Sequence, residues 1–154
     1  MKRIENSAAI ILNGPVSQVF PLFDPVNEMK WVNGWAPRFI YPPDGSVEEQ
    51  MIFITPARFP HEEDYHWVLT KFLPEFFQVE YTVSTRERIW WIRVRCFPID
   101  NSTHAEIRYQ FTALTDEGAE RNEQALSLMF QHNLVDWQDA INYYLRTGRK
   151  KERN

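Results

Sequence analysis

The side chains that could do chemistry are few, and they are neutral polar groups set among apolar residues. Asn133 falls between Phe130 and Trp137, inside the apolar stripe of a predicted C-terminal helix. Tyr81 and Tyr109 fall at the apolar positions of two alternating segments. A buried carboxamide or phenol needs a hydrogen-bond partner. These groups could therefore orient a ligand, polarise a carbonyl or place a proton, or they could bond to the backbone of a solid core.

Possible metal ligands concentrate in residues 61–66, which read His-Glu-Glu-Asp-Tyr-His. Their spacing matches no zinc or calcium pattern, so we expect a solvated loop and no metal. The sequence also has no phosphate-binding glycine loop, no HExxH pair, no G-x-S-x-G elbow and no Cys–His arrangement. No catalytic residue can be named on this basis, and no cofactor is expected.

The elements that must position these groups follow from local patterns. Residues 4–12 predict a first strand, and Pro15 suits the start of two short helices that reach about Trp31. Strands separated by short turns are predicted for residues 47–55, 65–73, 76–85, 88–97 and 103–115. Such short connections imply antiparallel neighbours. Apolar residues then recur at helical spacing from about residue 118 to Leu145, and Gly148 ends that helix.

Three of the predicted strands alternate between apolar and polar residues, so one face of the sheet is covered and the other is wet. The faces of the strand over 65–73 cannot be assigned. The covered positions are Phe77, Val79, Tyr81 and Val83, then Trp90, Ile92, Val94 and Cys96, then Ala105, Ile107, Tyr109, Phe111 and Ala113. The wet positions include Glu80, Arg93, Arg95, Glu106 and Arg108. Because acids lie among these bases, we expect cross-strand ion pairs and no anion site.

Composition narrows the class of partner. The chain of 154 residues has a net charge of −4. Residues 146–154 carry five bases and one acid, so the body before them has a net charge of −8, which argues against nucleic acid as the main partner. We expect a single domain over residues 1–146 and a basic, disordered tail over 147–154. A single cysteine forms no internal disulfide, and no apolar run is long enough to span a membrane. A cytoplasmic protein is the default expectation.

Four segments of the sequence resemble the SRPBCC superfamily of START-related and polyketide cyclase/dehydrase-like proteins. The resemblance lies in Gly14-Pro15-Val16-Ser17-Gln18-Val19-Phe20, in residues 24–31, in His66-Trp67-Val68-Leu69 and in residues 111–118. The resemblance implies an α+β helix-grip fold: a curved antiparallel sheet of about six to seven strands wrapped around the long C-terminal helix, with two short helices after the first strand. It also implies a cavity between sheet and helix for a lipid, polyketide or aromatic metabolite.

The expected function is binding or carriage of such a small hydrophobic molecule. The alternatives are a cyclase- or dehydratase-type enzyme that uses the same cavity, and a protein-interaction module without ligand. Trp31 and Trp35 could form a lid or close the core, and exposed Leu128 and Val135 could seat a second copy as a homodimer. The residues expected to line the cavity are Trp31, Trp35, Tyr81, Trp90, Tyr109, Phe111, Phe130, Asn133 and Trp137.

Overall fold

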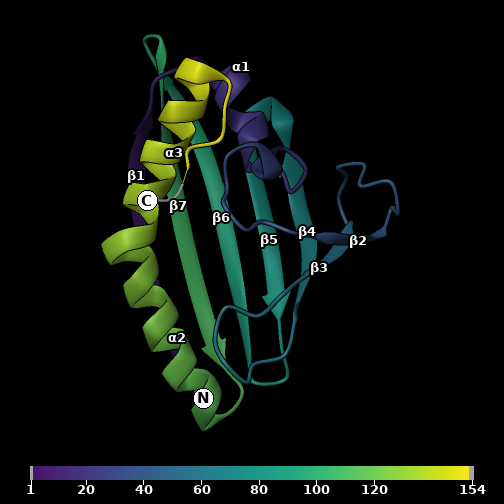
Figure 1. The fold of residues 1–154 in the computed structure, drawn as a ribbon. Helices are drawn as coiled ribbons and strands as arrows, with labels where there is room; N and C mark the ends of the chain where they lie inside the picture. The colour runs from purple at the N-terminus through teal and green to yellow at the C-terminus, as the bar shows by residue number, and fades with distance from the viewer. Residues whose placement is uncertain (1, 153–154) are drawn as a thin grey trace.

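The computed structural model describes residues 2–152 and contains one seven-stranded antiparallel sheet. Its strand order is β1-β7-β6-β5-β4-β3-β2, so sequence neighbours pair everywhere except at β1, which closes against β7 (Figure 1). The strands are β1 (Arg3–Leu12), β2 (Arg38–Tyr41), β3 (Ile52–Thr55), β4 (Tyr65–Leu73), β5 (Gln78–Ser84), β6 (Arg88–Ile99) and β7 (Ser102–Ala113).

Short helices follow the first strand, as predicted. They are α1 (Val16–Val19), η1 (Phe20–Phe23) and η2 (Asn27–Lys30), and a further turn, η3 (Pro74–Phe76), precedes β5. Pro21 lies in the first turn of η1, where its missing N–H costs nothing. The α1–η1 segment buries Val19, Phe20, Leu22 and Phe23 and so closes one end of the core.

A helical segment of 32 residues lies along the sheet (Figure 1). It consists of α2 (Asp116–Leu128), a π-helical turn η4 (Met129–Asn133) and α3 (Leu134–Thr147). Thr115 caps its start, since its hydroxyl accepts a hydrogen bond from Gly118 N at 3.0 Å, and Gly148 ends it with φ of +71°. The helix thus begins two residues before the predicted start.

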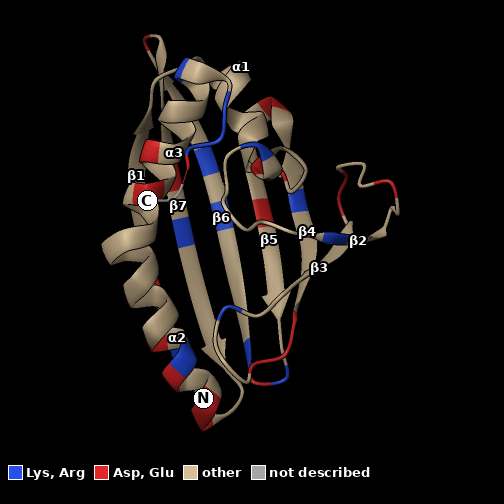
Figure 2. Ribbon diagram, in the orientation of Figure 1, with Lys and Arg blue, Asp and Glu red and all other residues tan. Residues whose placement is uncertain are grey.

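The predicted alternation holds on β5, β6 and β7, whose apolar side chains point to the covered face. On the other face, Glu106 pairs with Arg93 and Arg95 at 3.4 Å each, and Glu5 pairs with Arg108 at 3.0 Å. Figure 2 shows the opposite signs on neighbouring strands. Glu80 was predicted to be solvated on this face, but it is only 8% exposed. Its carboxylate accepts a hydrogen bond from Gln78 and pairs with Lys71.

Three strand predictions need correction or explanation. The strand predicted from Val47 begins only at Ile52, since Gln50 has φ of +70°. Phe77, predicted as a strand residue, ends η3 with φ of +54° and packs against Phe20. In β4 the pairing register shifts between Leu69 and Lys71. This bulge changes which parity faces inward and explains why the strand's faces could not be read from its sequence.

The C-terminal residues 148–152 leave the helix, and the carbonyl of Lys151 accepts a hydrogen bond from Asn33 at 3.1 Å. Arg153 and Asn154, the end of the predicted tail, lie outside the described residues. Within residues 2–152, no helix has the length and apolar character that a membrane crossing requires.

Candidate functional site

A cavity of about 320 Å³ lies between the covered face of the sheet and the long helix. The sheet contributes residues of β4 to β7, among them Trp67, Tyr81 and Ile92. The helix contributes Met129 and Trp137. The loop between β3 and β4 crosses the sheet beside this space (Figure 1) and also reaches its wall.

The structure brings most of the predicted cavity residues together. Those on the wall are Trp35, Tyr81, Trp90, Tyr109, Phe111, Asn133 and Trp137. Trp31 is not among them: it is 2% exposed, donates from Nε1 to Leu22 O at 2.7 Å and packs edge-on against Trp137. It closes the core, while Trp35 belongs to the cavity wall. Phe130 also stays off the wall and packs edge-on against Tyr109.

The two predicted phenols differ in their hydrogen bonding. Tyr81 donates to the backbone carbonyl of Phe23 at 2.6 Å, and burial raises its pKa well above the usual 10. Tyr109 and Asn133 have no side-chain hydrogen-bond partner among the described residues. Burial also raises the pKa of Tyr109, so neither phenol ionises near neutral pH. Tyr109 and Asn133 are therefore available to a ligand as neutral hydrogen-bonding groups.

A buried ion pair at one end of the cavity was missed from the sequence. Arg88 and Glu62 form two hydrogen bonds of 2.8 and 3.1 Å, and their side chains are 2% and 1% exposed. Tyr65 donates to Glu62 at 2.5 Å, and burial together with this bond raises its pKa to about 12. The solvated-loop prediction for residues 61–66 is thus wrong for Glu62 and Tyr65. No group of three or more metal-ligating side chains gathers within residues 2–152.

Glu28 is a second missed residue, and it brings a carboxyl group to the cavity wall from η2. Desolvation by burial, reinforced by the nearby charge of Asp24, raises its pKa well above 4.5. Arg58, also on the wall, lowers the pKa but does not cancel these effects. In the part of the chain that the structure describes, the Glu28 carboxyl forms no hydrogen bond or ion pair.

The π-helical turn η4 occupies the part of the long helix that faces the cavity, where Met129 and Asn133 lie on the wall. A π turn inserts one residue into the helical register and often occurs at functional sites. Leu128, the last residue of α2, was predicted on the outer side of the helix; it is 45% exposed but also borders the cavity. Val135 is exposed, as predicted, and His132 is exposed too.

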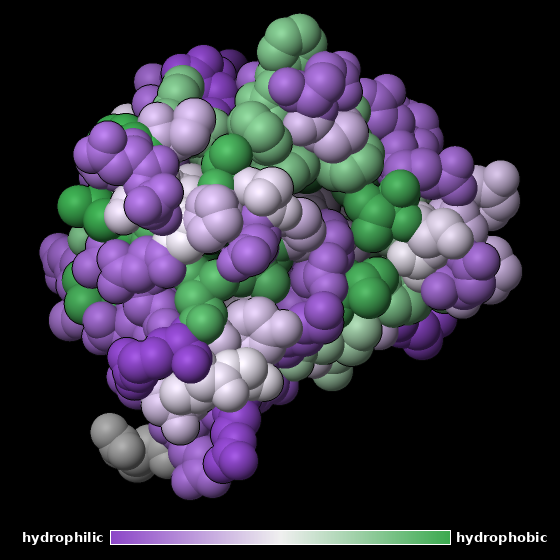
Figure 3. Space-filling view, turned by 90° about the horizontal axis from the view of Figure 1, so that it is seen from above, coloured by the Kyte–Doolittle hydropathy of each residue, from purple (hydrophilic) through white to green (hydrophobic). Residues whose placement is uncertain are grey.

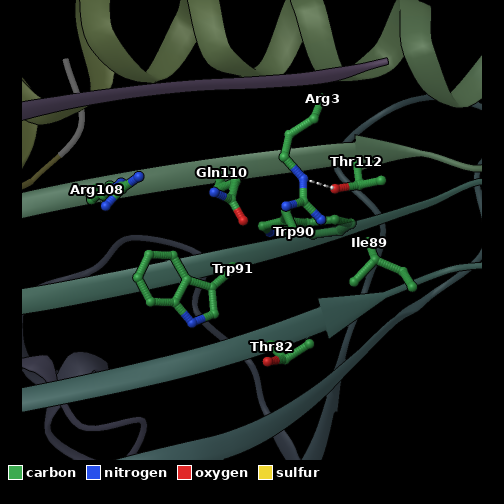
Figure 4. A pocket seen from close by; sticks show the side chains of 8 residues that line it. All are labelled: Arg3, Thr82, Ile89, Trp90, Trp91, Arg108, Gln110 and Thr112. Carbon is green, nitrogen blue, oxygen red and sulfur yellow. Dashed lines mark hydrogen bonds between the residues drawn. The ribbon is translucent and has the colours of Figure 1, made fainter. Parts of the chain in front are cut away.

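A second hollow, of about 240 Å³, lies on the opposite, wet face of the sheet (Figure 4). Most of its polar side chains are already paired: Arg3 donates to Thr112 at 2.9 Å, and Arg108 and Gln110 both donate to Glu5. It is therefore part of the surface ion-pair network, and the cavity beneath the sheet is the candidate site.

Comparison with solved structures identifies the fold. No protein family model matches the sequence, and no curated protein matches it. Solved structures do match. The Zhui aromatase/cyclase from Streptomyces sp. R1128 aligns with a TM-score of 0.70 at 12% identity, over 96% of this chain and 98% of its own. The chain has the helix-grip fold.

Two other solved structures share the fold. Norcoclaurine synthase from Thalictrum flavum, in complex with dopamine and hydroxybenzaldehyde, aligns with a TM-score of 0.67 at 12% identity, over 97% of this chain and 90% of its own. Ara h 8.0201 aligns with a TM-score of 0.67 at 10% identity, over 95% and 99%. At this identity the comparison establishes the helix-grip fold, and the function must be argued from the cavity.

Proposed function

We propose that this helix-grip domain binds a small, largely aromatic molecule in the cavity between its sheet and its long helix. The observation that carries this proposal is the open space of about 320 Å³ in an interior otherwise rich in packed aromatic rings. Protein interiors are normally close-packed. A space of this size beneath the sheet therefore departs from normal packing and favours a ligand-binding role.

The size and lining favour a small ligand. The volume is near the lower end of ligand pockets, roughly 300–1,000 Å³, which suits one or two rings better than a long lipid. The wall combines aromatic faces with a few polar groups that could set orientation, namely Glu28, Tyr109 and Asn133. The complex of norcoclaurine synthase with dopamine and hydroxybenzaldehyde shows molecules of this size with a protein of the same fold, which supports this choice.

Filling the cavity tests the proposal. Ala125 lines it from α2, whereas Ser127 is exposed on the same helix. Wild type, Ala125→Phe and Ser127→Phe would be purified in parallel, denatured, and their small-molecule extracts compared by mass spectrometry. We expect a compound that accompanies wild type and Ser127→Phe and is absent from Ala125→Phe. Equal recovery from all three proteins would contradict binding in the cavity.

Acid–base catalysis on the bound molecule is the second candidate, and Glu28 favours it. The phenols of Tyr81 and Tyr109 hold their protons too tightly to exchange them near neutral pH. The raised pKa of Glu28 moves toward the range that suits a general acid or base. If the recovered compound is turned over, Glu28→Gln should slow the reaction by roughly 10²-fold or more, while Glu120→Gln on the exposed face of α2 should not.

A protein-interaction module without ligand is less well supported. The most exposed large apolar residues, Phe76, Tyr41 and Val135, come from three separate elements. Seen from above, hydrophobic side chains form small groups divided by hydrophilic ones (Figure 3). This surface differs from the single continuous patch that a docking face requires. The homodimer and the cytoplasmic location stay predictions.

A further inference from the structure

Among residues 2–152, Glu28 is the one carboxyl group on the cavity wall, and its side chain has no hydrogen-bond or ion-pair partner there. Glu62, the carboxylate of the buried pair at one end of the cavity, is fully engaged by Arg88 and Tyr65. A buried or half-buried carboxylate is normally paired, because desolvation of an unpaired charge is costly. Among residues 2–152, no cation or hydrogen-bond donor fills this role for Glu28.

The local charges leave a place for a cation. Asp24 adds negative charge next to Glu28, while its own side chain accepts hydrogen bonds from Asn27 at 2.7 Å. Arg58 is an exposed side chain at the wall and forms no ion pair with Glu28. Its influence on the pKa of Glu28 is smaller than that of desolvation and of Asp24. The negative charge of an ionised Glu28 is therefore not balanced by the charged side chains around it.

The aromatic walls of this cavity already accommodate one organic cation. The Arg88 guanidinium carbon lies 4.2 Å from the centre of the Trp90 ring and 5.5 Å from those of Phe59 and Tyr65. All four residues line the cavity. Ring faces attract cations through their negative quadrupole, most strongly when water is excluded. The same type of wall, formed by Trp35, Trp67 and Tyr81, lies in the cavity that Glu28 faces.

We propose that Glu28 binds an ammonium group, so that the cavity selects small aromatic amines over neutral and acidic molecules of the same shape. This inference rests on the proposed function, because it assumes that the cavity is the ligand site. The ammonium group would pair with the Glu28 carboxylate, and the aromatic body would lie against the rings of the wall. Tyr109 and Asn133, whose side chains have no hydrogen-bond partner within the described part of the chain, would bind the remaining polar atoms of the ligand.

Three matched probes test the proposal: phenethylamine, 2-phenylethanol and phenylacetate, titrated at pH 8 by calorimetry. The wild type should bind the amine at least roughly tenfold more tightly than the alcohol, as one charge-assisted hydrogen bond provides, and the acid most weakly. Glu28→Gln should bind the amine and the alcohol equally. Its retained affinity for the alcohol shows that it is folded. Glu120→Gln, an exposed change on α2, should keep the wild-type preference.

The pH dependence provides a second readout. Only ionised Glu28 attracts the amine, so amine affinity should fall as pH decreases through the raised pKa of Glu28, while alcohol affinity stays level. The titratable and charged groups around Glu28 are Asp24, Arg58, Tyr81 and Tyr109. Both tyrosines stay neutral over pH 5–8, because burial raises their pKa. Asp24→Asn is the control for Asp24. In this variant amine affinity should still fall as pH decreases, because Glu28 is still present to be protonated.

The outcomes separate the two proposals. Alcohol binding without preference for the amine, or a preference that survives Glu28→Gln, would overturn the role of Glu28 and leave the cavity as a ligand site. Failure of all three probes to bind would overturn both proposals.

Discussion

Replacing Glu62 by Gln should destabilise the protein strongly, although residue 62 lies in a loop. The change removes the charge from a pair whose side chains are 2% and 1% exposed and leaves Arg88 buried without a counter-ion. Two charge-assisted hydrogen bonds of 2.8 and 3.1 Å are weakened or lost. Each such bond contributes roughly 1.5–3 kcal/mol. The Trp90 ring lies 4.2 Å from Arg88 in the wild type and should stay there in the variant, so this contact does not change the expected loss.

The expected loss is therefore about 3 kcal/mol in the free energy of unfolding, within the range of roughly 3–5 kcal/mol for breaking buried pairs. For a chain of this length, that loss lowers Tm by roughly 6–12 °C. Urea unfolding followed by tryptophan fluorescence measures it. Glu123→Gln is the matched control, because its ion pair with Lys2 is about 60% exposed on both sides and should contribute less than about 1 kcal/mol.

The double variant Glu62→Gln/Arg88→Met completes the test. Once Arg88 is replaced by an apolar side chain, no buried charge remains, so Glu62→Gln should cost much less in that background. The coupling between the two sites should be at least about 2 kcal/mol. A Glu62→Gln variant that loses less than about 1 kcal/mol, or single effects that simply add, would refute the reasoning.

Three further predictions concern stability. Glu28→Gln should stabilise the protein at pH 8, because the raised pKa makes ionisation of Glu28 costly in the folded state, by about 1.4 kcal/mol per pKa unit. This gain should shrink as pH falls and vanish below the unfolded value near 4.5; a gain independent of pH would contradict it. Gly118→Ala should cost several kcal/mol in urea unfolding, since its Cβ would lie 1.9 Å from the carbonyl oxygen of Glu87, whereas Gly148→Ala, with open space but φ of +71°, should cost about 1 kcal/mol. Equal costs would exclude the close contact as the cause. Thr115→Ala should lose about 1 kcal/mol of helix capping, and Thr115→Ser should recover most of it.

The fold could be predicted because its signals are local and repeated. Period-two alternation fixed the faces of β5, β6 and β7, and helical spacing fixed the long helix. Where one residue breaks the period, as at the β4 bulge after Leu69 or in the π turn at Met129–Asn133, the sequence pattern gives no warning. The wall positions of Tyr109 and Trp137 followed from the same periodicities.

The charged part of the site could not be predicted, because it depends on tertiary contacts. Glu62 lies among five other ionisable residues, which is the composition of a solvated loop, and becomes buried only when that loop meets Arg88 at the start of β6. Glu28 lies in η2, a short helix from which no cavity residue was predicted. The available signal was Arg88 itself, which falls two residues before Trp90 and therefore shares the covered face.

The six tryptophans allow the central claim to be tested in one spectrum. Trp35, Trp67, Trp90 and Trp137 line the cavity, Trp31 lies in the packed core, and Trp91 lies on the wet face of the sheet. The measurement is the ¹H–¹⁵N spectrum of the indole N–H groups during titration with phenethylamine and, separately, with 2-phenylethanol. Binding between sheet and helix predicts saturable shifts for the four cavity tryptophans while Trp91 stays in place. A spectrum in which no indole moves, or in which Trp91 moves as far as the cavity tryptophans, would contradict it.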